Sequence, residues 1–161
     1  METRMNLFDT AIGTKIGKRI HAVSQVIHAS PLATSTQELV QLRASQINGC
    51  GFCADIHSKD AAAAGEDTVR LGLVATWRHS TVFTDAEQAA LALTEEGTRI
   101  IDGHTGVTDE TWAQVRRHYD EEQAIALVSL VAMINATNRL GVILNNRGGS
   151  YVPGDLTTIA G

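Results

Sequence analysis

Residues 35–57 read STQELVQLRASQINGCGFCADIH, and this stretch predicts two helices with a turn between them. Ser35 and Glu38 have the spacing of a capping box, so the first helix is expected to begin there and to continue to about residue 47. Asn48-Gly49 is typical of a tight turn or a helix C-cap. A second helix is expected over residues 50–64, because a glycine follows it.

The rest of the chain is helical by the same criteria. Apolar residues recur at steps of three and four over residues 7–29, which predicts an amphipathic helix ending before Pro31. Further helices are expected at about 67–74, 84–103, 108–118 and 120–145. The last is apolar on nearly every side between Ala124 and Ile134, so we expect it at the centre of the fold or in a subunit interface.

The predicted fold class is therefore all-α, with a single domain. The chain has 161 residues, of which 43% are hydrophobic and 19% charged, as in a globular protein with one core. We expect an N-terminal helix within residues 1–34 and the core within 35–145. The glycine-rich segment 146–161 is predicted to be an extended C-terminal arm.

Charge and hydropathy exclude several classes of partner. Thirteen basic and eighteen acidic residues give a net charge of -5, which disfavours a nucleic-acid partner. The most apolar run, residues 124–134, is shorter than the roughly 20 residues that a bilayer-spanning helix needs. The N-terminus lacks the pattern of a signal peptide. We therefore expect a cytoplasmic protein without a membrane partner.

The two cysteines of the chain, Cys50 and Cys53, lie three residues apart, and His57 follows four residues later. On a helix these three side chains share one face. Two thiols beside an imidazole can carry out redox chemistry or bind a metal. In the cytoplasm such a pair is more often catalytic or metal-binding than a structural crosslink.

Three interpretations of this cluster differ in what else they require. Buried cysteines without a chemical role are common, but this spacing next to a histidine favours a function. Structural zinc needs four ligands, whereas this segment offers three and no second pair exists in the sequence. Redox chemistry needs only thiols at a helix N-terminus, where backbone N–H groups favour a thiolate. Since His57 is one turn from Cys53, we assign Cys53 as the attacking thiol and Cys50 as the resolving thiol.

Glu38 lies twelve residues before Cys50 and has two interpretations. It completes the expected capping box with Ser35. Alternatively, the turn between the two helices folds its carboxylate back toward His57, where it would orient the imidazole and raise its basicity. The spacing alone leaves both open.

The stretch from Glu38 to His57 resembles the core motif of the alkylhydroperoxidase AhpD-like group, within the carboxymuconolactone decarboxylase superfamily. The signature is a glutamate, a Cys-x-x-Cys twelve residues later and a histidine four residues after that. Weaker landmarks follow in the order of the family, at Trp77-Arg78, 83–92 and 135–140.

This resemblance implies a helical bundle that assembles into homotrimers or homohexamers and acts as an antioxidant peroxidase. It implies Glu38 and His57 as a proton relay, Cys53 as the peroxidatic thiol and Cys50 as the resolving thiol. No metal and no cofactor beyond the Cys50–Cys53 disulfide are implied. The implied partners are a hydroperoxide substrate and an unidentified thiol or lipoyl-type reductant.

One position departs from the family pattern. The best-known peroxidase branch has a histidine just before the second cysteine, where this chain has Phe52, which cannot transfer protons. A second branch, the carboxymuconolactone decarboxylases, acts on lactones without a cysteine pair, so Cys50 and Cys53 disfavour that alternative. A non-enzymatic zinc-binding or structural oligomer is the remaining alternative.

Overall fold

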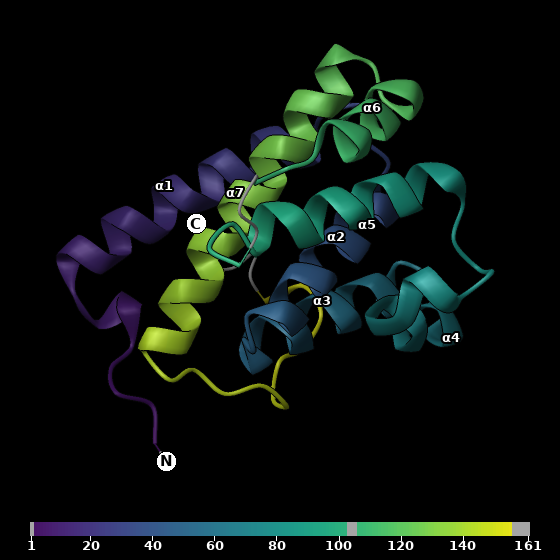
Figure 1. Ribbon diagram of the computed structural model, residues 1–161. Helices are drawn as coiled ribbons and strands as arrows, with labels where there is room; N and C mark the ends of the chain where they lie inside the picture. Colours follow the sequence, from purple (N-terminus) through teal and green to yellow (C-terminus); the bar gives the residue numbers. More distant parts are fainter. Residues whose placement is uncertain (1, 103–105, 156–161) are drawn as a thin grey trace.

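The computed structural model describes residues 2–102 and 106–155, which form helices and loops without a strand (Figure 1). The all-α prediction is confirmed. The helices are α1 Ala11–His28, α2 Thr34–Ile47, α3 Gly51–Ala63, α4 Thr68–Leu73, α5 Asp85–Thr98, α6 Asp109–His118 and α7 Glu121–Ile143, with short 3-10 helices η1 Leu7–Asp9 and η2 Val74–His79.

Side-chain caps fix the starts of the later helices where the sequence predicts them. Full capping boxes are present at the starts of α5 and α7, and the Thr108 side chain accepts a backbone N–H at the start of α6. The end of α5 differs from the prediction, because Arg99 leaves helical geometry with φ -94° and ψ 39°. Residues 103–105, to which that helix was expected to extend, lie outside the described residues.

The capping box predicted at Ser35 is wrong. The N-cap of α2 lies two residues earlier, at Ala33, and makes no side-chain hydrogen bond at the cap. Ser35 therefore lies inside the first turn, and the Glu38 carboxylate bonds to His57 of α3 instead. The helix start is set by packing rather than by a local cap, since nine of its fourteen residues are buried.

Helix α2 lies at the centre of the bundle, in contact with α3, α5 and α7 (Figure 1). Side chains of α2 belong to two apolar clusters. One contains Val40 and Leu127 and includes side chains of α5, α6 and α7. The other contains Leu39 and Trp77 and joins α2 to α3, α4 and η2. Burial on both sides holds α2 firmly, which makes it a rigid support for polar side chains that face α3.

Helix α7 is long and apolar enough to span a bilayer, but 44% of its most apolar window is buried within the fold. It contacts α1, α2, α3 and α5, which is the environment of a core helix. The apolar side of α1 is only partly buried within the single chain. Ile27 is buried, whereas Ile12 and Val26 are 70% and 73% exposed.

The described part of the C-terminal arm, residues 146–155, turns back along α3 (Figure 1). The backbone N–H groups of Gly149 and Tyr151 donate to Asp55 Oδ2 at 2.6 and 3.1 Å, and Lys59 Nζ donates to the carbonyls of the same two residues. The hydrogen bond from Lys59, followed by that from the Gly149 amide, lowers the pKa of Asp55. The remainder of the predicted arm lies outside the described residues.

Candidate active site

The turn between α2 and α3 brings the end of one helix against the start of the other. Asn48 is the C-cap of α2, and Gly49 follows with φ +67°, a backbone conformation that glycine adopts without steric cost. The backbone N–H of Cys50 then donates to the Ser45 carbonyl at 3.0 Å. The predicted turn is confirmed, and it places the first cysteine beside the last turn of α2.

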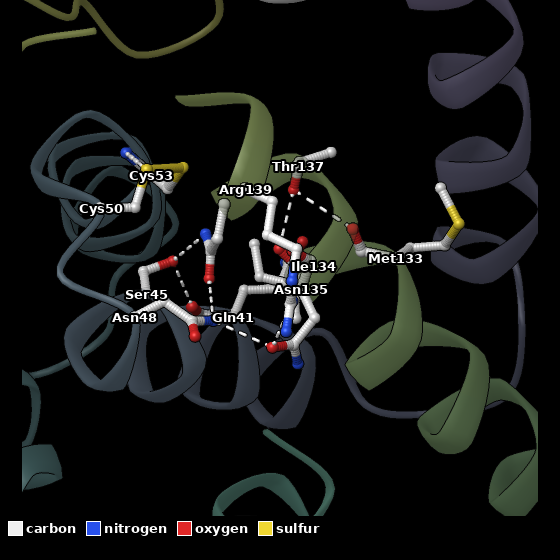
Figure 2. The surroundings of a disulfide bond; sticks show 11 residues. Gln41, Ser45, Asn48, Cys50, Cys53, Met133, Ile134, Asn135, Thr137 and Arg139 are labelled. Carbon is white, nitrogen blue, oxygen red and sulfur yellow. Dashed lines mark hydrogen bonds between the residues drawn. A yellow bond between two sulfur atoms is a disulfide. The ribbon is translucent and has the colours of Figure 1, made fainter. Parts of the chain in front are cut away.

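Cys50 and Cys53 form a disulfide across the first turn of α3, with their Cα atoms 5.4 Å apart (Figure 2). Helix α3 begins at Gly51, so Cys50 is its N-cap, and Cys50 Sγ accepts the backbone N–H of Cys53 at 3.3 Å. Both residues are buried, at 2% and 5% exposure. The pair therefore lies at the positive end of the α3 dipole but inside the protein.

A glycine of α7 makes room for the disulfide. A Cβ atom at Gly141 would lie 2.8 Å from Cys50 Sγ and 3.5 Å from Cys53 Sγ. Glycine inside a helix costs about 1 kcal/mol relative to alanine. At Gly141 the close approach of two sulfur atoms explains it, and α7 thus forms one wall of the disulfide's surroundings.

Gly141→Ala is expected to make the disulfide easier to reduce. The added methyl collides with Cys50 Sγ in the disulfide, whereas a free thiol can rotate away. Overpacking costs about 1–3 kcal/mol, and about 1.4 kcal/mol corresponds to 30 mV for a two-electron couple. Equilibration of the purified protein with dithiol buffers measures the reduction potential, which should rise by about 30 mV. Gly72→Ala is the control, because a Cβ there meets nothing within 4 Å.

A buried layer of side-chain amides joins the turn to α7 (Figure 2). Asn48 Nδ2 donates to Asn135 Oδ1 and to Asn138 Oδ1, each at 2.9 Å. Asn138 Nδ2 donates to Ser45 Oγ at 3.0 Å, and Asn138 is fully buried. Buried polar groups with good partners rigidify their surroundings, so this layer fixes the backbone just before Cys50.

Glu38 and His57 form the second polar pair of the site. Glu38 Oε2 lies 3.1 Å from His57 Nδ1, and the two side chains are only 11% and 14% exposed. A neutral imidazole that donates from Nδ1 to the carboxylate keeps Nε2 as the nitrogen that accepts a proton. Of the two interpretations of Glu38, the geometry therefore matches the one that orients His57.

The structure joins Cys50 to Cys53 and pairs His57 with Glu38, so the four predicted site residues form two pairs at the start of α3 and on the facing α2. Trp77, one of the weaker family landmarks, is 4% exposed and donates its indole N–H to Glu95 at 3.0 Å. Sequence reasoning missed Gly141, and it noted residues 135–140 only as a family landmark without a role for their amides. Asn135 and Asn138 carried a usable signal, because they are amides in an otherwise apolar helix.

Comparison with known proteins shows the family of this chain. A model of the carboxymuconolactone decarboxylase family matches residues 16–96, about half of the chain. The chain belongs to the carboxymuconolactone decarboxylase family. The matched segment contains α2, the turn and α3, and with them Glu38, Cys50, Cys53 and His57.

Relatives place the chain among the AhpD-like members of the carboxymuconolactone decarboxylase family. It is 40% identical over 121 residues to the uncharacterized protein YdfG of Bacillus subtilis, covering 75% of this chain and 81% of YdfG. A protein of unknown function from Agrobacterium tumefaciens, described as a candidate antioxidant defence protein AhpD, is 29% identical with a TM-score of 0.86. That match covers 93% of this chain and 100% of the other. The debrominase Bmp8 has the same fold, with 20% identity, a TM-score of 0.70 and coverage of 82% and 70%.

Proposed function

We propose that this protein is a thiol-dependent peroxidase that reduces hydroperoxides with the Cys50–Cys53 pair. One observation carries the proposal: the disulfide lies in the first turn of α3, and His57, one turn further along the same helix, is paired with Glu38 of α2. A dithiol that closes to a disulfide can deliver two electrons, and an oriented imidazole can move the accompanying protons. These are the groups that peroxide reduction by thiols requires.

The proposed cycle begins when His57 Nε2 takes the proton of the Cys53 thiol. The Cys53 thiolate attacks the terminal oxygen of the hydroperoxide, the O–O bond breaks, and the alkoxide leaves as an alcohol with the proton held by His57. Cys53 is then a sulfenic acid. The Cys50 thiol loses its proton and attacks Cys53 Sγ, a disulfide forms, and the hydroxide leaves as water with that proton. An external dithiol, of thiol or lipoyl type, returns two electrons and two protons.

The surroundings of the two sulfurs favour this division of roles. Cys53 precedes His57 by one turn of the same helix, whereas Cys50 caps the helix and lies against Gly141. Cys50 is also the less exposed of the two, at 2% against 5%. We therefore assign the attack on peroxide to Cys53 and the closing of the disulfide to Cys50.

Thiol titration with mass spectrometry tests the proposal. Reduced protein treated with one equivalent of cumene hydroperoxide should lose both titratable thiols and about 2 Da of mass, and dithiothreitol should restore both. Persistence of both thiols would rule the proposal out. Turnover of a lactone by a Cys50→Ser, Cys53→Ser double variant would favour the decarboxylase alternative. Stoichiometric zinc in the native protein would favour a metal-binding oligomer.

Glu38→Gln is expected to slow the reaction of reduced protein with hydroperoxide roughly tenfold to a hundredfold. The amide preserves the shape of Glu38 but removes the charge that orients and polarises His57. Stopped-flow measurement of thiol loss at pH 7 gives the second-order rate constant. Glu66→Gln is the matched control, because Glu66 pairs with Arg70 outside the site. Equal rates in Glu38→Gln and the parent protein would contradict the relay.

We further propose that the protein forms a homotrimer or homohexamer in the cytoplasm. Apolar side chains of α1 and α7 are exposed in the single chain, and covering them with other copies would remove this area from water. They include Ile12 and Val26 of α1, and Ile125 and Ile143 of α7, which are 60–73% exposed. The cytoplasm suits the proposal because its thiol pools keep such a pair reduced between turnovers.

A further inference from the structure

Gln41 of α2 is a buried side chain with an unused donor. The residue is 8% exposed, its Nε2 atom is sealed from solvent, and that atom has no hydrogen-bond partner within the described part of the chain. An unmade hydrogen bond of a buried amide is destabilising, and such groups are uncommon in folded proteins. The Gln41 side-chain amide therefore has an N–H donor for which the disulfide-bonded protein provides no acceptor among the described residues.

The register of α2 against α3 places Gln41 level with Cys53. At one end of this helix pair the Cys50 amide donates to the Ser45 carbonyl at 3.0 Å, and at the other Glu38 meets His57 at 3.1 Å. On α2, Gln41 lies one turn from Glu38 and one turn from Ser45. On α3, Cys53 likewise lies one turn from Cys50 and one turn from His57. Figure 2 shows Gln41 next to Ser45, whose hydroxyl donates to the Gln41 backbone carbonyl at 2.7 Å.

Reduction of the cysteines would supply the missing partner. In the disulfide Cys53 Sγ is neutral and accepts hydrogen bonds weakly. In the reduced protein a Cys53 thiolate would carry a full negative charge at a site only 5% exposed. A buried anion needs donors, and hydrogen bonds to charged groups are the strong ones. We propose that Gln41 Nε2–H donates to the Cys53 thiolate and thereby lowers the pKa of the Cys53 thiol.

This inference rests on the proposed redox role of Cys53. The charged and titratable groups nearby already have partners: Glu38 with His57, Arg139 of α7 with Asn135, and Asp55 of α3 with Lys59 and the arm. Gln41 differs from all of them because it does not titrate, so its donor is available at every pH. It would stabilise the thiolate even when His57 is neutral.

The pH dependence of Cys53 alkylation tests the proposal. In a Cys50→Ser background Cys53 is the only thiol of the chain, and its reaction with iodoacetamide follows the thiolate fraction. Gln41→Met in that background removes the donor at similar volume. The thiol pKa should rise by about one unit, which lowers the alkylation rate at pH 7 about tenfold and leaves the high-pH limit unchanged.

Gln37→Met in the same background is the matched control. Gln37 lies one turn earlier on α2 and also has an unpartnered buried atom, but that atom is the acceptor Oε1, which cannot serve a thiolate. The pKa in Gln37→Met should equal that of the Cys50→Ser parent. An unchanged pKa in Gln41→Met, or an equal rise in both variants, would overturn the inference.

A second measurement keeps the inference testable if Gln41→Met does not fold. The side-chain amide resonances of Gln41 in the ¹⁵N spectrum of the Cys50→Ser protein should titrate with the Cys53 thiol, and a flat response would overturn the donor role. Failure of the peroxidase proposal is seen separately, as absence of the Cys50–Cys53 disulfide after peroxide treatment of the parent protein. The thiol pKa can respond to Gln41 whichever oxidant the protein uses.

Discussion

Cys53→Ser is expected to reduce peroxide turnover at least about a thousandfold, to the level of the buffer control. A serine hydroxyl stays protonated near neutral pH, so the variant lacks the nucleophile that attacks the O–O bond. Peroxide consumption in the presence of dithiothreitol, corrected for the reaction of dithiothreitol alone, measures the loss. The Cys50 thiol remains in this variant, but it caps α3 and lies against Gly141.

Cys50→Ser is the matched variant that separates the two roles. It should still react once with peroxide, because Cys53 and the Glu38–His57 pair are unchanged. The sulfenic acid then has no resolving thiol and should accumulate as an adduct with dimedone, detected by mass spectrometry on the peptide containing Cys53. An adduct on Cys50 in the Cys53→Ser protein, with none on Cys53 in the Cys50→Ser protein, would reverse the assignment.

Glu95→Gln is expected to destabilise the fold by about 3 kcal/mol, because it removes the anion at the centre of a buried ionic cluster. Glu95 of α5 accepts two hydrogen bonds from Arg43, at 2.5 and 2.8 Å, and others from Trp77 and Arg78 at 3.0 Å. The variant leaves the Arg43 guanidinium, 11% exposed, without its counter-charge. Urea unfolding followed by circular dichroism measures the change in the free energy of unfolding.

Glu121→Gln serves as its control. Glu121 and Arg116 are 3.8 Å apart and Glu121 is 93% exposed, so the same change there should cost less than about 0.5 kcal/mol. Equal losses of unfolding free energy in the two variants would show that the cluster around Glu95 stabilises the fold no more than an exposed ion pair does. Loss of peroxidase activity in folded Glu95→Gln protein is not expected, because the cluster lies outside the candidate site.

The same cluster gives the stability a pH dependence. Burial alone would raise the pKa of Glu95, but hydrogen bonds from Arg43 and Trp77 outweigh it and hold the pKa below the ordinary 4.5. The stabilisation is thus complete above about pH 4.5 and is lost as the pH falls through the lowered value. Unfolding at pH 3–6 should show a smaller pH dependence in Glu95→Gln than in the parent protein.

Most of the fold follows from local signals in the sequence. Thr84 and Asp120 cap the helices that they predict, because a capping side chain acts on its own backbone. The start of α2 could not be predicted this way, since the tertiary contact with His57 takes the Glu38 carboxylate from its expected local partner. The periodicity of α1 predicts the helix, but it does not show that Ile12 and Val26 stay exposed in the single chain.

The candidate site also combines local features, which the sequence predicts, with long-range contacts, which it does not. The spacing of Cys50, Cys53 and His57 is local, so one helix suffices to place them on one face. Gly141 and the amides of α7 approach from about ninety positions away, and no short spacing encodes that contact. The unused donor of Gln41 is not visible in the sequence, because it depends on how the tertiary packing buries that side chain.

The arm that lies along α3 gives this protein a built-in spectroscopic reporter. The amides of Gly149 and Tyr151 share Asp55 Oδ2, two residues beyond Cys53 on the same helix. Any movement of Asp55 on reduction of the disulfide would change the hydrogen bonds of two backbone N–H groups far along the chain. Their chemical shifts and exchange rates allow the oxidation state of the cysteines to be followed without a label on either sulfur.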